Sequence, residues 1–430
     1  MNCTQFTDQP RCCVMSMRRT ERDFAPQNQR GNKMDVLTYI REKLPLTLRK
    51  NEKDDDTLIG LPYPYTVPCA DGMFNELYYW DTYFTNKALF AVGNIEQAKN
   101  NVLDILYLIG KFGYMPNGNR TYYLKRSQPP YAALMVDDVY RATDDLEFLR
   151  NAVPVLKKEY GFWTTKRVSD NGLNHYGTEE DEESCKNFYE NYVSTRIVTD
   201  GKRDAAYAGK CYFAECESGW DFNPRFQGYC VDFNPVDLNA NLYFYEKLFA
   251  EYEVLLNIGD GKAWESKAKS RAEKMNTLMR DSLTGVYRDY NYKTKEQSPV
   301  ISAASFQPYF AGVAGEEQKS SLKKLLSVLK GEFGVFTTEK MTDKYQWAYP
   351  NLWAPCQYIA VKALENYGYI EEAKRVAGKY AKLIECNFQS HGKLFEKYNG
   401  LTGGIDAVSE YGTPEMLGWT AGVYLECKKL

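Results

Sequence analysis

The apolar positions of the chain follow a helical repeat from about residue 35 onward, interrupted by loops rich in glycine and aromatic residues. The repeat is clearest at residues 263–282, 318–330 and 371–388, where apolar residues recur every three or four positions. Alternation with a period of two, which indicates strands, is weak throughout. The pattern therefore predicts an all-α fold.

Six loops begin with a glycine that is soon followed by aromatic residues, and glycine commonly ends a helix. Neighbouring loops lie far enough apart for two helices and their connections. Six helical hairpins predict a closed toroid, the (α/α)6 barrel, with the loops gathered at one mouth. The alternative is an open superhelix of repeats, but the intervals are uneven and the loops differ in sequence. The six glycines are Gly113, Gly172, Gly219, Gly285, Gly334 and Gly392.

Composition and charge narrow the choice of partners. The chain has 430 residues, 44% of them apolar, and a formal net charge of −3. It therefore has no broad basic field to attract nucleic acid or an acidic membrane, and no apolar run is long enough to span a bilayer. Residues 1–34 are predicted to be a polar, disordered tail, and residues 35–430 a single catalytic domain. The sequence does not define an oligomeric state.

The first thirty residues lack the apolar segment of a secretory signal. The eleven cysteines are odd in number and irregularly spaced, without a CxxC motif. This favours scattered reduced thiols over a disulfide framework or a zinc site. From these two features we expect a cytoplasmic location.

Aromatic residues make up 15% of the chain, whereas histidine occurs only at His175 and His391. Aromatic rings suit a site that stacks against flat ligand faces, including sugar rings. Two histidines exclude a histidine-rich metal site and argue against Ser-His-Asp or Cys-His catalysis. If the protein is an acid–base enzyme, carboxylates are the expected proton carriers.

The stretch ESGWDFNPRF, residues 217–226, places Asp221 beside Trp220. The acid either belongs to a surface turn or is a catalytic acid whose pKa is raised by an aromatic pocket. Glu396 lies in another loop far along the chain. Hydrolysis of a glycosidic bond needs such a pair, one acid to protonate the leaving oxygen and one base to activate water.

Three further loops carry aromatic residues together with polar groups suited to sugar hydroxyls. In DGMFNELYYWDTYF, residues 71–84, Glu76 and Asp81 interrupt an aromatic stripe that would otherwise indicate a core helix. YMPNGNRTYYLKRSQPP, residues 114–130, is rich in amide and guanidinium groups, although an ordinary surface loop is also polar. YQWAYPNLWAP, residues 345–355, contains two tryptophans and two prolines.

These motifs, with PVDLNANLYFYEK, YRDYN, FEKY and GWTAGV, resemble the trehalase family in order and approximate spacing. The resemblance covers roughly residues 61–425. It implies an (α/α)6 barrel and an inverting glycoside hydrolase that splits α,α-trehalose into two glucoses, without a metal or organic cofactor. It also implies that Asp221 is the general acid, that Glu396 is the general base, and that Glu410 is a carboxylate on a mobile loop closing over the sugar.

The predicted site thus has two catalytic carboxylates and a larger set of substrate-binding residues. The catalytic pair is Asp221 and Glu396. The substrate-binding residues are Phe74, Tyr78, Trp80, Asp81, Asn117, Arg126, Gln128, Glu183, Trp220, Trp347, Trp353 and Glu410.

The chain departs from the family pattern at several sugar-binding positions. Met73 stands where the family has an arginine, and Asp181 or Glu182 occupies the place of a second. Ala348 replaces an aspartate, and the glycine-rich loop before Glu410 is thinned. An arginine donates several hydrogen bonds in a fixed fork, so these losses remove donors that a disaccharide would use.

Three functions remain open from the sequence. The first is hydrolysis of α,α-trehalose. The second is the same chemistry on another small α-glucoside or α-mannoside, such as a glycosyl-glycerate, although the acidic run at residues 179–183 argues against a negatively charged substrate. The third is a sugar-binding protein that has lost catalysis, which the presence of all three carboxylates disfavours.

Overall fold

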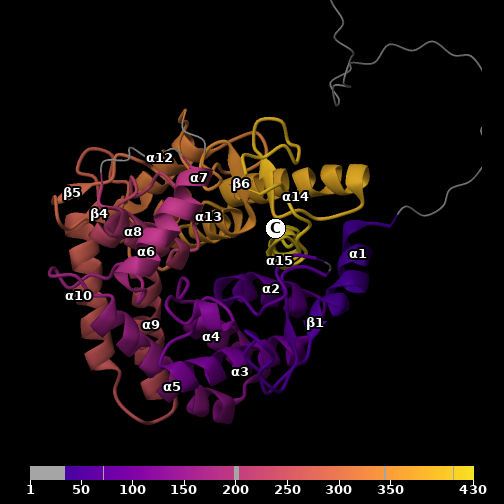
Figure 1. Ribbon diagram of the computed structural model, residues 1–430, viewed down its shortest axis with the longest axis horizontal. Helices are drawn as coiled ribbons and strands as arrows, with labels where there is room; N and C mark the ends of the chain where they lie inside the picture. Colours follow the sequence, from indigo (N-terminus) through magenta and orange to yellow (C-terminus); the bar gives the residue numbers. More distant parts are fainter. Residues whose placement is uncertain (1–33, 71, 198–202, 343–344, 410) are drawn as a thin grey trace, which may run out of the picture. The chain divides into compact units, whose positions relative to one another are not determined.

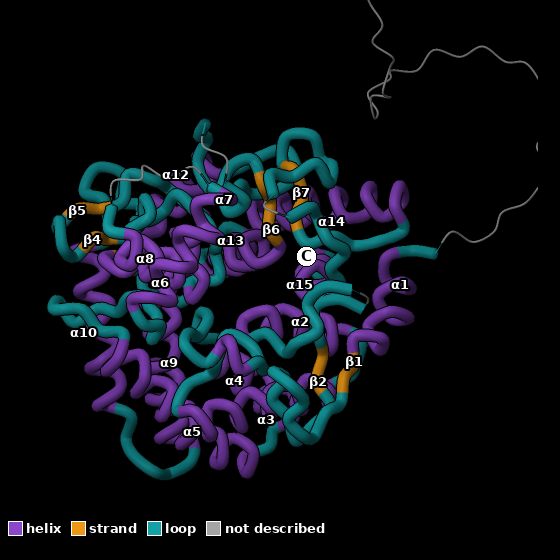
Figure 2. Tube along the Cα trace, viewed as in Figure 1, coloured by secondary structure: helices purple, strands orange, loops and turns teal. Residues whose placement is uncertain are grey.

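The computed structural model describes residues 34–70, 72–197, 203–342, 345–409 and 411–430. The chain divides after Asp35, and every described helix and strand belongs to the unit from Val36 to Leu430. Apart from Met34, the predicted N-terminal tail lies outside the described residues. Helices dominate this unit, and its strands are two or three residues long, which confirms the predicted all-α class (Figure 2).

Six helices pack in a closed cycle, in which each contacts the next and the last contacts the first. Because α15 packs against α2, the array closes on itself, and Figure 1 shows these two helices side by side. This closure is that of the predicted (α/α)6 barrel and excludes the open superhelix. The six are α2 (Tyr79–Ala91), α4 (Ala132–Thr143), α9 (Val236–Leu255), α11 (Gln307–Phe310), α13 (Ala354–Asn366) and α15 (Gly418–Cys427).

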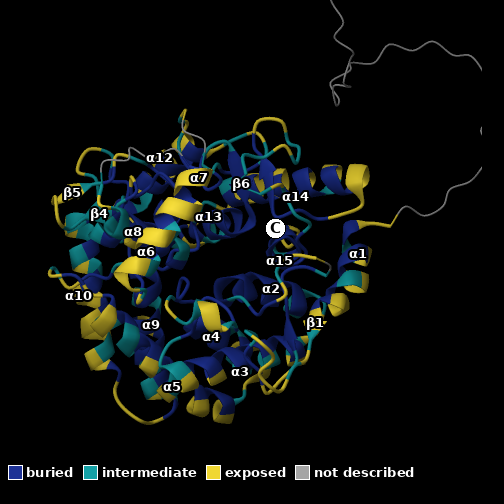
Figure 3. Ribbon diagram, viewed as in Figure 1, coloured by how far each residue is buried: buried dark blue, intermediate teal, exposed yellow. Residues whose placement is uncertain are grey.

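A second set of helices lies outside this cycle and presents one apolar face to it. These helices have buried residues at helical spacing and exposed residues between them, whereas α2, α13 and α15 are buried nearly all round (Figure 3). The outer helices are α3 (Ile95–Phe112), α5 (Leu146–Lys166), α10 (Lys262–Leu278), α12 (Lys319–Leu329) and α14 (Ile370–His391). A shorter helix of this kind is α1 (Val36–Lys43).

The three helices predicted from apolar spacing are confirmed as α10, α12 and α14. Helix α10 ends four residues before the predicted boundary, since Arg280 forms a β-bridge with Tyr287. Gly113 and Gly392 end α3 and α14 in the left-handed conformation, as their positions predicted. The Gly219 loop differs, because it follows α8 (Ala205–Glu217), which packs against α6 (Glu182–Phe188) rather than within the cycle.

Short strands join loops near the helix ends. A two-stranded antiparallel sheet pairs β6 (Asn351–Trp353) with β7 (Lys397–Asn399), with Trp353 opposite Lys397. A three-stranded sheet joins β3 (Phe233–Asn234), β4 (Tyr290–Asn291) and β5 (Glu296–Gln297). The last pair is β1 (Leu48–Arg49) with β2 (Tyr65–Thr66). The β6–β7 pair is the one that matters for the site, since Glu396 immediately precedes β7.

Candidate active site

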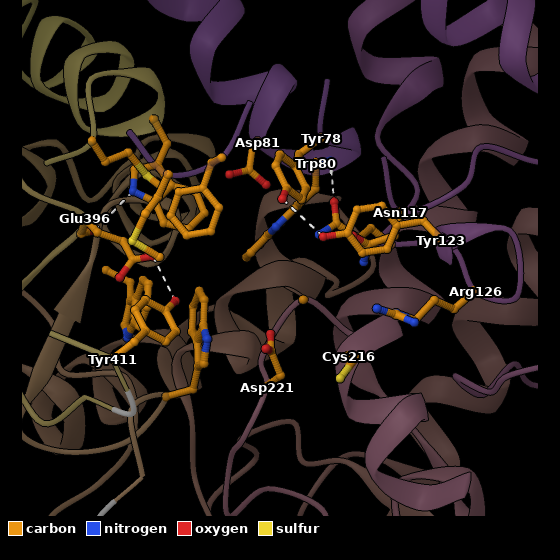
Figure 4. A pocket seen from close by; sticks show the side chains of 18 of the residues that line it. Tyr78, Trp80, Asp81, Asn117, Tyr123, Arg126, Cys216, Asp221, Glu396 and Tyr411 are labelled. Atoms are coloured by element: carbon orange, nitrogen blue, oxygen red, sulfur yellow. Dashed lines mark hydrogen bonds between the residues drawn. The ribbon is translucent and has the colours of Figure 1, made fainter. Parts of the chain in front are cut away.

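One pocket of about 510 Å³ collects residues from widely separated loops. Eleven of the fourteen predicted site residues line it, including both predicted catalytic carboxylates. Figure 4 shows the carboxylates of Asp81, Asp221 and Glu396 facing the same space. The eleven are Phe74, Tyr78, Trp80, Asp81, Asn117, Arg126, Gln128, Asp221, Trp347, Trp353 and Glu396.

Three predicted residues are not among those that line the pocket. Glu183 lies on α6 with its side chain exposed to solvent, so its prediction as a substrate ligand is not supported by its position. Trp220 lies behind the wall, where its ring stacks on Trp347 at 5.1 Å and 22°. Glu410 lies outside the described residues.

The segment carrying Asp221 is fixed at both ends by buried charges. Glu217, at the end of α8, accepts hydrogen bonds from Arg167 Nε (2.9 Å), Ser127 N (2.8 Å) and Gly177 N (2.6 Å). On the other side, Arg225 pairs with Asp237 and Asp289. Gly219 is required between these anchors, because its φ is +71° and a Cβ there would lie 3.0 Å from the Trp80 ring.

Asp221 has the protonation behaviour expected of a general acid. It is partly buried, and desolvation raises its pKa from 3.8 to about 6. The backbone and Arg126 oppose that rise, while the charge of Glu396 adds to it. The carboxyl therefore holds its proton at mildly acidic pH, whereas an exposed aspartate would have lost it.

Glu396 is held from two directions. Tyr411 donates a hydrogen bond to its Oε1 at 3.0 Å, and the Lys397 ammonium contacts Oε2. Burial raises the pKa of Glu396, and both partners lower it. The Trp419 indole also donates to the backbone carbonyl of Glu396 at 3.1 Å, which ties this residue to α15.

The first turn of α2 contributes Trp80 and Asp81 to the lining of the pocket. Gln128 Oε1 accepts a hydrogen bond from Trp80 N at 3.2 Å, joining the second loop to the start of this helix. Asp81 is buried beside Glu396 and Asp221, and desolvation raises its pKa to about 8, so it stays protonated at neutral pH. A neutral carboxyl can donate a hydrogen bond to a ligand oxygen, which an ionised one cannot.

Several polar residues that looked like sugar ligands are structural. Glu76 accepts hydrogen bonds from Arg120 (2.7 Å) and Tyr78 (2.9 Å) and does not line the pocket. Asn119 accepts from Leu77 N at 2.8 Å. The Asp181 side chain caps α6 by accepting a hydrogen bond from Ser184 N.

The structure adds pocket residues that the sequence did not single out. Tyr122, Tyr123 and Trp419 belong to motifs already quoted, whereas Tyr411 and Met416 lie between the FEKY and GWTAGV motifs. Phe188, Tyr192 and Arg196 lie between motifs, and their spacing of four residues was the available signal. Neither histidine lines the pocket, in keeping with carboxylate chemistry.

An aromatic pocket that contains Asp81, Asp221 and Glu396 is suited to binding a sugar and to acid–base hydrolysis of a glycosidic bond. The trehalase family model matches residues 9–429. The chain is 33% identical to the periplasmic trehalase of Pseudomonas aeruginosa, over 92% of this chain and 76% of the relative. It is 31% identical to the periplasmic trehalase of Citrobacter koseri, over 86% and 69%. The chain therefore belongs to the trehalase family.

Solved structures show a similar fold. The neutral trehalase of Saccharomyces cerevisiae superposes with a TM-score of 0.74 at 29% identity, covering 85% of this chain and 73% of that one. A GH63 mannosylglycerate hydrolase from Thermus thermophilus, in complex with Tris and D-glycerate, superposes with a TM-score of 0.64. At 16% identity, over 91% of this chain and 99% of that one, the second likeness concerns the fold alone.

The bacterial relatives also correct one expectation. We expected a cytoplasmic location, and this is contradicted because both are named periplasmic. The expectation used the polar first thirty residues and the odd cysteine count, and neither feature determines where a folded enzyme acts. In the described part of the chain, no helix has the length and apolar character needed to cross a membrane.

Proposed function

We propose that this protein hydrolyses α,α-trehalose to two glucoses with inversion, and that residues 35–430 act as one catalytic domain. The observation that carries the proposal is the pair Asp221 and Glu396, two carboxylates in one pocket with different partners. Asp221 faces Arg126 across the pocket and has a raised pKa, whereas Glu396 is hydrogen-bonded by Tyr411 and paired with Lys397. Membership of the trehalase family supports the choice of substrate.

In the proposed reaction, the protonated Asp221 donates its proton to the glycosidic oxygen as the bond to the anomeric carbon breaks. Ionised Glu396 removes a proton from a water molecule, whose oxygen attacks that carbon from the opposite face. One glucose leaves with the donated proton, and the other gains a hydroxyl from the water in the β configuration. Asp81 and the surrounding rings of Trp80 and Trp347 hold the glucosyl ring.

The test is glucose release from trehalose by the purified protein and its variants. Asp221→Asn and Glu396→Gln should each lower kcat by at least about 10²–10⁴-fold with unchanged thermal unfolding. Asp170→Asn, an exposed carboxylate outside the pocket, is the matched control and should retain full activity. NMR of the first turnovers should show α- and β-glucose in equal amounts. Near-full activity in either pocket variant would contradict the assigned roles.

The pH profile and a rescue experiment separate the two roles. Because Asp221 must be protonated and its pKa is about 6, kcat/KM should decline as pH rises above about 6. Sodium azide should restore turnover to Glu396→Ala, with β-glucosyl azide as the product, since azide attacks without a base. Azide rescue of Asp221→Ala instead would reverse the assignment.

A further inference from the structure

Three rings and one guanidinium form a stack beside the pocket, and all of them except the Phe213 ring line it. The Phe188 ring lies 4.0 Å from the Phe213 ring on α8, at 15°, and 5.2 Å from the Tyr192 ring, at 20°. The guanidinium carbon of Arg196 lies 3.6 Å from the centroid of Tyr192. We call this set, Phe213, Phe188, Tyr192 and Arg196, the aromatic ladder.

The ladder is a product of helix geometry. Phe188 ends α6, Tyr192 lies in the following π-helix Tyr189–Val193, and Arg196 ends α7 (Ser194–Arg196). A spacing of four residues keeps side chains on one helical face. Phe188, Tyr192 and Arg196 all line the pocket, so the exposed face of this segment is part of the site. Stacking on a ring uses the flat face of a guanidinium and directs its N–H donors along the edge.

Positive and negative side chains lie in different parts of the pocket. In Figure 4, Glu396 and Tyr411 lie on one side of Asp221, and Arg126 and Cys216 lie on the other. Arg126 also lies 5.5 Å from the Phe213 ring, so both pocket arginines flank the same ladder. Its buried Nε has no hydrogen-bond partner among the described residues.

The direction of the proposed reaction assigns this side to the leaving group. In an inverting hydrolysis, water attacks from the side of the base, and the leaving group departs from the opposite face. With Glu396 as base, the leaving group lies beyond Asp221, beside Arg126 and the ladder. The acidic run at residues 179–183 does not oppose this, since Glu179 is paired with Arg167 at 2.6 Å and Glu183 faces solvent.

We propose that Arg196, positioned by the aromatic ladder, determines specificity for the leaving half of the substrate by donating hydrogen bonds to its oxygen atoms. This rests on the proposed glycosidase function. The expected leaving half is a group rich in oxygen atoms, such as a second sugar or a small polyol acid. The proposal also assigns a binding role to a segment that the family motifs do not include.

Two substrates with the same glucosyl group but different leaving groups test the proposal. Trehalose has a leaving glucose that can contact Arg196, whereas α-glucosyl fluoride releases fluoride, which is too small to reach the ladder. Arg196→Gln should lower kcat/KM for trehalose about 10- to 100-fold, because it removes charged hydrogen bonds to the leaving glucose. It should leave the fluoride reaction unchanged. Tyr192→Ala should give the same selective loss, because it removes the platform beneath the guanidinium. Arg196→Lys should fall in between.

The control variant is measured with the same two substrates, trehalose and α-glucosyl fluoride. Arg375→Gln, an exposed arginine on α14, should change neither reaction. Equal losses on both substrates, or no loss on either, would overturn the role of Arg196, and thermal unfolding of each variant reports any folding defect. If the wild type cleaves the fluoride but not trehalose, the choice of trehalose fails. The same comparison is then made with glucosylglycerol and glucosylglycerate in place of trehalose. A selective loss of kcat/KM for either substrate in Arg196→Gln supports the proposal.

Discussion

Lys397 places a positive charge directly beside Glu396 inside the protein. Its side chain is fully buried, and its ammonium contacts Oε2 of Glu396 while lying over the rings of Trp353 (4.9 Å) and Tyr411 (4.6 Å). Burial raises the pKa of Glu396, and Lys397 opposes that rise. At the scale of one residue, the neighbouring cation limits how far burial raises the pKa of the proposed base.

Lys397→Met removes this charge but keeps an unbranched apolar side chain of similar length. The pKa of Glu396 should then rise, so the acidic limb of the kcat/KM profile should move to higher pH. Activity below the new limb should fall by at least about tenfold. Lys397→Arg, which keeps the charge, should restore much of the original profile.

The matched control is Lys393→Met. Lys393 is an exposed lysine that pairs with Glu415 and lies shortly before Lys397 and strand β7 in the sequence. This variant should leave the profile in place. A uniform loss of activity in Lys397→Met, without movement of the acidic limb, would show that Lys397 serves packing rather than the charge of Glu396.

At the scale of elements, the loop after α8 is positioned by ion pairs rather than by regular structure. Glu217 joins that helix end to Arg167 and to the backbone of Ser127, the residue before Gln128 of the pocket. Glu217→Gln would leave Arg167 buried beside an uncharged amide. We expect the free energy of unfolding to drop by about 3–5 kcal/mol and kcat to fall, although Glu217 does not line the pocket.

Urea unfolding and trehalose kinetics together check this expectation, and the chain offers an internal control. Glu179 pairs with the same Arg167, but half of its side chain is exposed. Glu179→Gln should therefore cost less than about 1 kcal/mol. Equal effects of the two variants would mean that burial of the pair is not what stabilises this loop.

The elements also show what sequence can and cannot predict. Helices with one apolar face, such as α12 and α14, were predicted because their repeat is visible in the sequence. Helices buried on all sides, such as α2 and α15, lack that repeat, and their contact joins segments more than 300 residues apart. The carboxylates of the site were predicted from local motifs. Arg196 was not, since its place in the pocket depends on how a π-helix and α8 pack.

At the scale of the whole molecule, several buried carboxyl groups share a raised pKa. Desolvation raises the pKa of Asp81 and of Asp104 to about 8, and that of Glu159 to about 7. The unfolded chain releases these protons near pH 4, so between about pH 4 and pH 8 the folded state binds more protons than the unfolded state. The contribution of these three groups to the free energy of unfolding should therefore fall as pH rises through this window.

Asp104 on α3 tests this linkage away from the active site. Its Oδ1 accepts a hydrogen bond from Tyr63 N at 3.0 Å, and its Oδ2 is buried without a hydrogen-bond partner in the described residues. Asp104→Asn keeps the acceptor and cannot ionise, so urea unfolding should show a weaker decline between pH 5 and 8.5. Between pH 5 and pH 8.5, the variant should lose about 1–3 kcal/mol less of its free energy of unfolding than the wild type does.

A second aspartate provides the opposite sign. Asp145 caps α5, and its pKa is lowered first by the hydrogen bond from Lys99 and then by Phe148 N–H. It stabilises the fold once ionised, and this contribution grows as pH rises through the lowered pKa, below about pH 4, and is constant above it. Asp145→Asn should therefore weaken the gain in stability as pH rises toward about pH 4 and leave the slope between pH 5 and 8.5 unchanged. A changed slope between pH 5 and 8.5 in both variants would mean that the loss of one negative charge, rather than burial of the carboxyl, explains the effect of Asp104→Asn.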